Sequence, residues 1–149
     1  MAQLPLDDPV VAGLLEGPNL ARLAYIGLDA RPRVVPIWCT YRDGEVIMVT
    51  GPKAAKVPAI EANPAVAISI DASKPPYHVL LIHGDASIEA TEGMAEEYPE
   101  IVRRYLGDQG AEAYLAPMRE RVKTQRRIRV NVRSYRVLDF VKRFPRSLR

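Results

Sequence analysis

Apolar and polar residues follow strand-like patterns in six stretches of the chain, which cover residues 20–28, 33–41, 45–50, 65–71, 77–90 and 127–133. The alternation is strict in the last stretch, where Ile128, Val130 and Val132 alternate with Arg127, Arg129, Asn131 and Arg133. A period of two places these two sets on opposite faces of a strand. We therefore expect a mainly β fold whose last strand is half buried and has a basic outer face.

A tight turn is predicted between the second and third stretches. Asp43-Gly44 lies there, and both residues accept the positive φ angles that a two-residue hairpin turn needs. Residues 34–41 are therefore expected to pair antiparallel with residues 45–50.

The loop after this hairpin carries the first candidate chemistry. Thr50 and Gly51 are followed by Lys53 and Lys56, which places two ammonium groups and free backbone N–H groups at the end of a strand. An anion fits such a site. The alternative interpretation is that both lysines are merely solvated.

Helical patterns connect or follow the strands at residues 8–16, 57–62, 92–106 and 111–115. The last helix is expected either to end near Pro117 or to resume to Val122. Asp7 or Asp8 is the expected N-cap of the first helix, with Pro9 at its first position. In the third helical stretch we expect Pro99 to divide the helix into two pieces and Gly107 to form its C-cap.

Length and composition indicate one compact domain over residues 1–149, because a hydrophobic content of 48% is enough for a core. No apolar run approaches the roughly 20 residues that cross a bilayer, so we expect no membrane contact. The acidic start of the chain does not resemble a signal peptide, and the lone Cys39 has no disulfide partner. These features favour a cytoplasmic location and a buried cysteine.

Charge is unevenly distributed along the chain. Residues 119–149 contain twelve Lys or Arg residues against only Glu120 and Asp139, whereas the rest of the chain is net acidic. Two interpretations stay open. The basic segment either binds a large anion, or it aids solubility and pairs with the acidic residues between Glu92 and Glu112.

Motifs of metal or nucleophilic catalysis are missing from the sequence. His78 and His83 are five residues apart on an expected strand, so they face opposite sides and cannot share a metal ion. There is no nucleophile elbow, phosphate-binding P-loop or dinucleotide fingerprint. If the protein is an enzyme, a bound cofactor is expected to carry the chemistry.

The order of these segments resembles a known family. Leu20 to Asp71 looks like the first half of the split β-barrel flavoproteins related to pyridoxamine 5′-phosphate oxidase, and most closely their flavin/deazaflavin oxidoreductase branch. The matching pieces are Arg31-Pro32-Arg33, the strand through Trp38, the hairpin to Thr50, the loop ending at Lys56, and Asn63-Pro64 before the next strand. Lys56 is followed by Val57-Pro58, where such proteins often carry a further basic residue and Asn-Leu.

The resemblance implies a six-stranded antiparallel split β-barrel that forms a homodimer and binds FMN or coenzyme F420 in the groove between two copies. In this family the cofactor transfers hydride or electrons to a small organic substrate. Val35, Pro36, Ile37 and Trp38 would flank its ring system, Thr50, Gly51, Lys53 and Lys56 would hold its phosphate, and Tyr77 belongs to the same cofactor-binding set. A core position is the equally open interpretation of Trp38.

The basic segment bears on which cofactor binds. F420 carries a polyglutamate tail in addition to a phosphate, so Arg127 and Arg129 would attract it more strongly than FMN. Either cofactor remains possible from the sequence, and some similar barrels bind haem instead.

Two other functions compete with catalysis. One is a non-catalytic protein that stores or senses a flavin or haem. The other is a nucleic-acid-binding module that uses Arg126, Arg127, Arg129 and Arg133, but the residues that alternate with these arginines are aliphatic rather than aromatic. We therefore expect no nucleic-acid partner.

Overall fold

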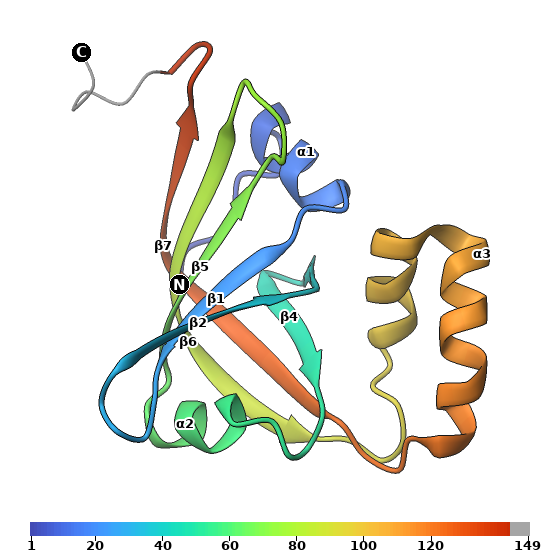
Figure 1. Cartoon of the computed structure of the whole chain (residues 1–149). Coiled ribbons are helices and arrows are strands. Elements are labelled where there is room, and N and C mark those ends of the chain that lie inside the picture. The colour runs from blue at the N-terminus through green and yellow to red at the C-terminus, as the bar shows by residue number, and fades with distance from the viewer. Residues whose placement is uncertain (144–149) are drawn as a thin grey trace.

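The computed structural model describes residues 1–143 and forms one antiparallel sheet with three helices. The sheet has seven strands in the order β2-β1-β5-β6-β7-β4-β3 (Figure 1). The elements are α1 (Pro9–Glu16), β1 (Ala21–Ile26), β2 (Pro32–Ile37), β3 (Cys39–Arg42), β4 (Glu45–Thr50), α2 (Lys56–Ala62), β5 (Ala65–Asp71), β6 (His78–Ala90), α3 (Tyr98–Arg121) and β7 (Arg126–Asp139).

The seventh strand arises because the stretch expected at 33–41 divides at Trp38. Its first half, β2, pairs with β1, and only its second half, β3, pairs with β4. The expectation that residues 34–41 pair throughout with 45–50 is therefore wrong for 34–37. Since β2 and β3 are the two edges of the sheet, Trp38 joins these edges covalently, which is the arrangement of a split barrel.

The predicted hairpin turn is confirmed. Arg42 pairs with Glu45, and the two residues between them, Asp43 and Gly44, have φ angles of 53° and 81°. Both angles are positive, as a two-residue turn of this hand requires.

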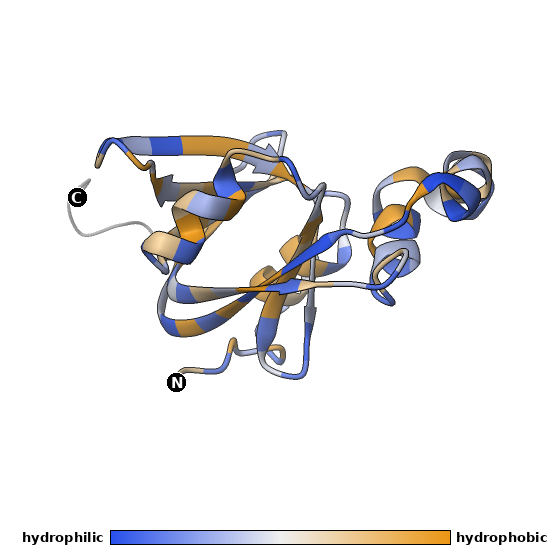
Figure 2. Ribbon diagram, turned by 90° about the horizontal axis from the view of Figure 1, so that it is seen from below, coloured by the Kyte–Doolittle hydropathy of each residue, from blue (hydrophilic) through white to orange (hydrophobic). Residues whose placement is uncertain are grey.

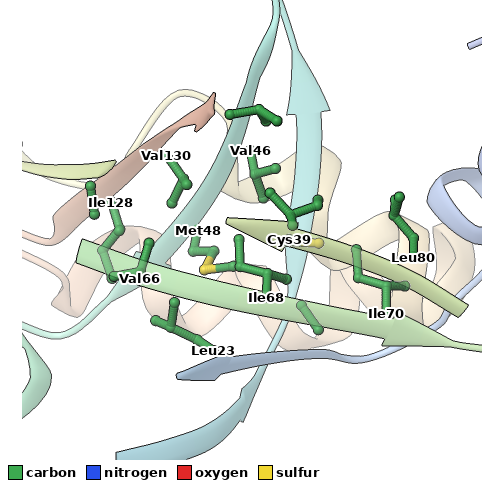
Figure 3. Packing of buried hydrophobic residues seen from close by; sticks show 14 of the residues in the cluster. Leu23, Cys39, Val46, Met48, Val66, Ile68, Ile70, Leu80, Ile128 and Val130 are labelled. Carbon is green, nitrogen blue, oxygen red and sulfur yellow. The ribbon is translucent and has the colours of Figure 1, made fainter. Parts of the chain in front are cut away.

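The barrel interior holds the main hydrophobic core. Inward-facing strand residues such as Leu23, Met48, Ile68 and Ile128 pack together there (Figure 3). Helices α1 and α2 add apolar side chains to the same cluster, among them Val11, Leu14, Ala59 and Ile60. Cys39 is buried in this core, as expected for a lone cysteine.

Local signals explain where the first helix begins and ends. Asp8 is the N-cap, its carboxylate accepts a hydrogen bond from the Val10 N–H at 2.9 Å, and Pro9 occupies the first turn. The helix ends at Gly17, as the sequence predicts.

One expectation about the third helical region is wrong. Pro99 does not break a helix, because α3 begins at Tyr98 and a proline in the first turn has no intrahelical N–H bond to lose. Of the two ends predicted for the last helix, the continuation toward Val122 is confirmed, since α3 runs through Pro117 to Arg121. Gly107, with a φ of 73°, does interrupt the helix where a C-cap is predicted.

The two halves of α3 form a helical hairpin beside the barrel (Figures 1 and 2). Arg104 connects this hairpin to the barrel and to α1, because its guanidinium donates hydrogen bonds to the carbonyls of Gly17, Leu14 and Cys39. No helix within residues 1–143 is both long and apolar enough to span a bilayer.

Candidate functional site

Strand β2 presents an edge that a ligand can address. It pairs only with β1, so within residues 1–143 its other side has no strand partner. Val35 and Ile37 pack against the barrel core, whereas Pro36 is exposed. A proline is tolerated here because it removes a hydrogen-bond donor from an edge strand rather than from a ladder.

Trp38 is committed to packing against the helical hairpin. Its ring stacks on Tyr105 with centroids 5.1 Å apart and an interplanar angle of 7°, and Tyr114 lies 5.9 Å away. The Tyr105 hydroxyl in turn donates to the Asn19 carbonyl at 2.9 Å. The structure therefore favours the core interpretation of the indole, and leaves the backbone of residues 35–38 available to a ligand.

Thr50 and Lys56 are brought together at the end of β4. The Lys56 ammonium donates a hydrogen bond to the Thr50 hydroxyl, with Nζ and Oγ1 3.2 Å apart. Partial burial lowers the pKa of Lys56, because a charged amine is less stable away from water. No carboxylate among residues 1–143 forms an ion pair with this lysine.

The other two members of the predicted anion loop are exposed. Gly51 has open space on the side where a Cβ would stand, so an approaching group meets the backbone directly. Lys53 lies at the loop surface. Of the four residues of the loop prediction, only Thr50 and Lys56 contact each other through their side chains.

Sequence reasoning missed Arg126 as a site residue. The register pairs Thr50 with Arg126, so these two side chains share one face of the sheet. Arg127 is paired instead with Val49 and faces the other way. The strict alternation of 127–133 already contained this signal, because Arg126 has the parity of the buried residues Ile128 and Val130.

Arg127 and Arg129 are engaged by carboxylates on the opposite face. Arg127 pairs with Glu97 at 2.8 Å and with Glu89 at 3.1 Å. Arg129 pairs with Glu89 and Glu45, at 2.9 and 3.3 Å. These contacts join β4, β6 and β7 to the start of α3.

Much of the remaining basic segment is also paired. Arg119, Arg133 and Arg143 form ion pairs with Glu112, Asp85 and Asp8. Arg146 and Arg149 lie outside the described residues. Pairing with the acidic residues between Glu92 and Glu112, one of the two alternatives, is found for Arg127 with Glu97 and for Arg119 with Glu112, whereas the other carboxylate partners lie outside that segment.

Tyr77 lies far from the Thr50 cluster in one copy of the chain. It is 47% exposed and immediately precedes His78, the first residue of β6. Arg126 pairs with Ala90, the last residue of that strand. Twelve steps along a strand correspond to about 40 Å.

A cavity of about 1020 Å³ opens at the Tyr77 end of the barrel. Its wall includes His78 and the buried Asp139, 3.5 Å apart, and Arg143, while Val10 and Leu14 of α1 supply apolar surface. None of the predicted site residues lines it. We place more weight on the Thr50 cluster, because it combines unpaired cations with open backbone.

Comparison with known proteins agrees with this architecture. The family model described as pyridoxamine 5′-phosphate oxidase matches residues 8–138. None of the curated proteins matches the chain.

Similar solved structures include an F420 reductase, with 23% identity, a TM-score of 0.64 and coverage of 83% of this chain and 94% of the other. A conserved hypothetical protein from Mycobacterium tuberculosis has 20% identity and a TM-score of 0.68, with 95% and 92% covered. General Stress Protein 26 from Bacillus anthracis has 17% identity and a TM-score of 0.63, with 89% and 94% covered. At these identities the likeness concerns the fold.

Proposed function

The chain belongs to the pyridoxamine 5′-phosphate oxidase family, and from this premise we propose that it is an oxidoreductase that binds FMN or coenzyme F420 and acts on a small organic substrate. The observation that carries the proposal is the hydrogen bond from Lys56 to Thr50, the last residue of β4. A half-buried ammonium without a carboxylate partner is a suitable place for the phosphate that both cofactors carry.

The residues present fit such a cofactor in two respects. The Thr50 hydroxyl, the Lys56 ammonium and the backbone at Gly51 supply hydrogen-bond donors for a phosphate. The free edge of β2 offers backbone donors and acceptors to the polar rim of a ring system. When bound, the flavin or deazaflavin would supply the hydride or electron transfer, and the protein would hold and orient it.

We further propose that the protein acts as a homodimer. Val34, Ala24, Ala67 and His83 form a row of cross-strand partners over β2, β1, β5 and β6, and all four are exposed or half exposed. Small and apolar residues in such a row suit contact with a second sheet better than contact with water. In this family the cofactor lies in the groove between two copies, so Tyr77, which is remote from the Thr50 cluster within one chain, would contribute to the site from the second copy.

A non-catalytic flavin-binding protein is the second candidate. Among the described residues no histidine or carboxylate contacts Thr50, Lys56 or Arg126, so the cluster has no evident proton donor or acceptor besides its own cations.

Titration of the purified protein with FMN and with F420, followed by visible absorption and fluorescence, tests the proposal. We expect saturable binding of one cofactor at a stoichiometry of one per chain. Reduction of the bound cofactor and its reoxidation by organic acceptors then separate an oxidoreductase from a storage protein. Absence of binding to both cofactors would refute the proposal.

A further inference from the structure

We propose that Arg126 is a third phosphate-binding group, which together with Thr50 and Lys56 holds the phosphate of the cofactor. The inference rests on the proposed function, because it adds a residue to the same site. The ligand chemistry is a phosphate ester, which either FMN or F420 supplies.

The register places Arg126 where this role requires it. Thr50 and Arg126 are direct cross-strand partners in the β4–β7 ladder, so their Cα atoms are about 5 Å apart and their side chains leave the same face. The Thr50 hydroxyl already accepts a hydrogen bond from the Lys56 ammonium, with Nζ and Oγ1 3.2 Å apart. Thr50 is thus hydrogen-bonded to Lys56 and is the ladder partner of Arg126.

Arg126 is also free to bind an anion. Its Nη1 donates to the Thr124 hydroxyl at 2.9 Å and to the Gln125 carbonyl at 3.1 Å, and within residues 1–143 no carboxylate pairs with it. Arg127 and Arg129, on the opposite face, have two carboxylate partners each. The N–H groups of Nε and Nη2 of Arg126 therefore remain available, and their spacing matches two oxygens of one phosphate.

The contacts with Thr124 and Gln125 also orient the guanidinium. They restrain the side chain at the start of β7, so less conformational freedom is lost when an anion binds.

The test compares Arg126→Gln with the matched control Arg133→Gln. Both variants lose one arginine from β7, but Arg133 is seven residues, or about 23 Å, further along the strand and pairs with Asp85 on the surface. Isothermal titration with FMN, riboflavin and F420 gives the affinities. Amide NMR spectra recorded during titration with inorganic phosphate report on Thr50 and Gly51 without any cofactor, and thermal melting verifies folding.

We expect Arg126→Gln to weaken the binding of the phosphate-bearing cofactor by about ten- to hundred-fold, as for other charge-assisted contacts. Riboflavin, which lacks the phosphate, should bind equally well to all three proteins. The cofactor whose affinity falls more in Arg126→Gln, FMN or F420, is the one whose phosphate occupies the site. Arg133→Gln should resemble the wild type throughout.

Failure of the inference and failure of the proposed function are distinguishable. One outcome is that neither cofactor binds, but phosphate shifts the amide resonances of Thr50 and Gly51 and Arg126→Gln abolishes these shifts. The three residues would then form a phosphate site, and the proposed cofactor would be wrong. If a cofactor binds and Arg126→Gln leaves its affinity and the phosphate shifts unchanged, the role of Arg126 is overturned and the proposed function stands.

Discussion

The carboxylate of Glu97 lies 2.8 Å from the Arg127 guanidinium, and the two side chains are only 5% and 14% exposed. Glu97 directly precedes α3, whereas Arg127 is on β7, so this ion pair ties the helical hairpin to the barrel. Removing one partner of a buried pair leaves the other charge uncompensated, which makes such pairs costly to break.

Glu97→Gln is accordingly expected to lower the free energy of unfolding by about 1–3 kcal/mol, because a charge-assisted hydrogen bond is lost in a buried position. Glu89 still contacts Arg127, which limits the loss. Urea denaturation measures the effect. Glu96→Gln is the matched control, since Glu96 is an exposed neighbour, and an equal loss in both variants would contradict the structural role of the pair.

The same pair predicts part of the acid sensitivity. Burial alone would raise the pKa of Glu97, but the hydrogen bond and charge of Arg127 outweigh it and hold this pKa below its usual range. A carboxyl group whose pKa is lower in the folded state stabilises the fold above its unfolded pKa of about 4.3, and this contribution is lost as pH falls through the folded pKa. Below about pH 4.3 the wild type should therefore lose its stability advantage over Glu97→Gln.

Local sequence signals were sufficient to predict several elements. The φ requirements of Asp43-Gly44 fixed the hairpin turn, and Asp8 with Pro9 fixed the start of α1. Strand β5 spans Ala65–Asp71, as the pattern indicates.

Long-range relationships were beyond the sequence. The division of one apolar stretch at Trp38 depends on stacking against Tyr105, which lies 67 positions away in the chain. Pairing of the basic segment with the acidic residues between Glu92 and Glu112 was one of the two interpretations of the sequence, and Glu97 agrees with it. Glu89 and Glu45 come from β6 and β4, and nothing in the sequence pointed to them. Periodicity placed the arginines on a face, but only the register revealed which arginine stands beside Thr50.

The two lysines of the candidate site, Lys53 and Lys56, give the most direct binding prediction. Replacing Lys53 and Lys56 together with alanine should weaken cofactor binding by roughly ten- to hundred-fold, the value of a charge-assisted contact of about 1.5–3 kcal/mol. The fold should persist, because Lys53 is exposed and Lys56 forms no ion pair with the described carboxylates. Fluorescence titration measures the affinity, and Lys74→Ala, in the exposed loop before β6, controls for loss of charge. Coincident titration curves for the double variant and the wild type would identify both lysines as solvated.

Arg127 and Arg129 now lead to a prediction about cofactor choice. Binding a polyglutamate tail would require these arginines to give up Glu97, Glu89 or Glu45. We expect the double replacement by glutamine to lower the melting temperature and to leave the ratio of FMN to F420 affinity unchanged. A selective, salt-dependent loss of F420 affinity would instead restore recognition of the tail by these residues.

The oligomeric state determines whether the site is shared between two copies. Ala67 is half exposed at the centre of the cross-strand row, between Ala24 and His83. Its replacement by glutamate would bury a charge in any interface formed there, and an uncompensated buried charge costs several kcal/mol. In light scattering at micromolar concentration the wild type should be a dimer and Ala67→Glu a folded monomer. Ala113→Glu, on the exposed surface of α3, should remain dimeric. If cofactor affinity falls together with the dimer, the groove between copies forms part of the site. A monomeric wild type that binds its cofactor with full affinity would confine the site to residues of a single chain.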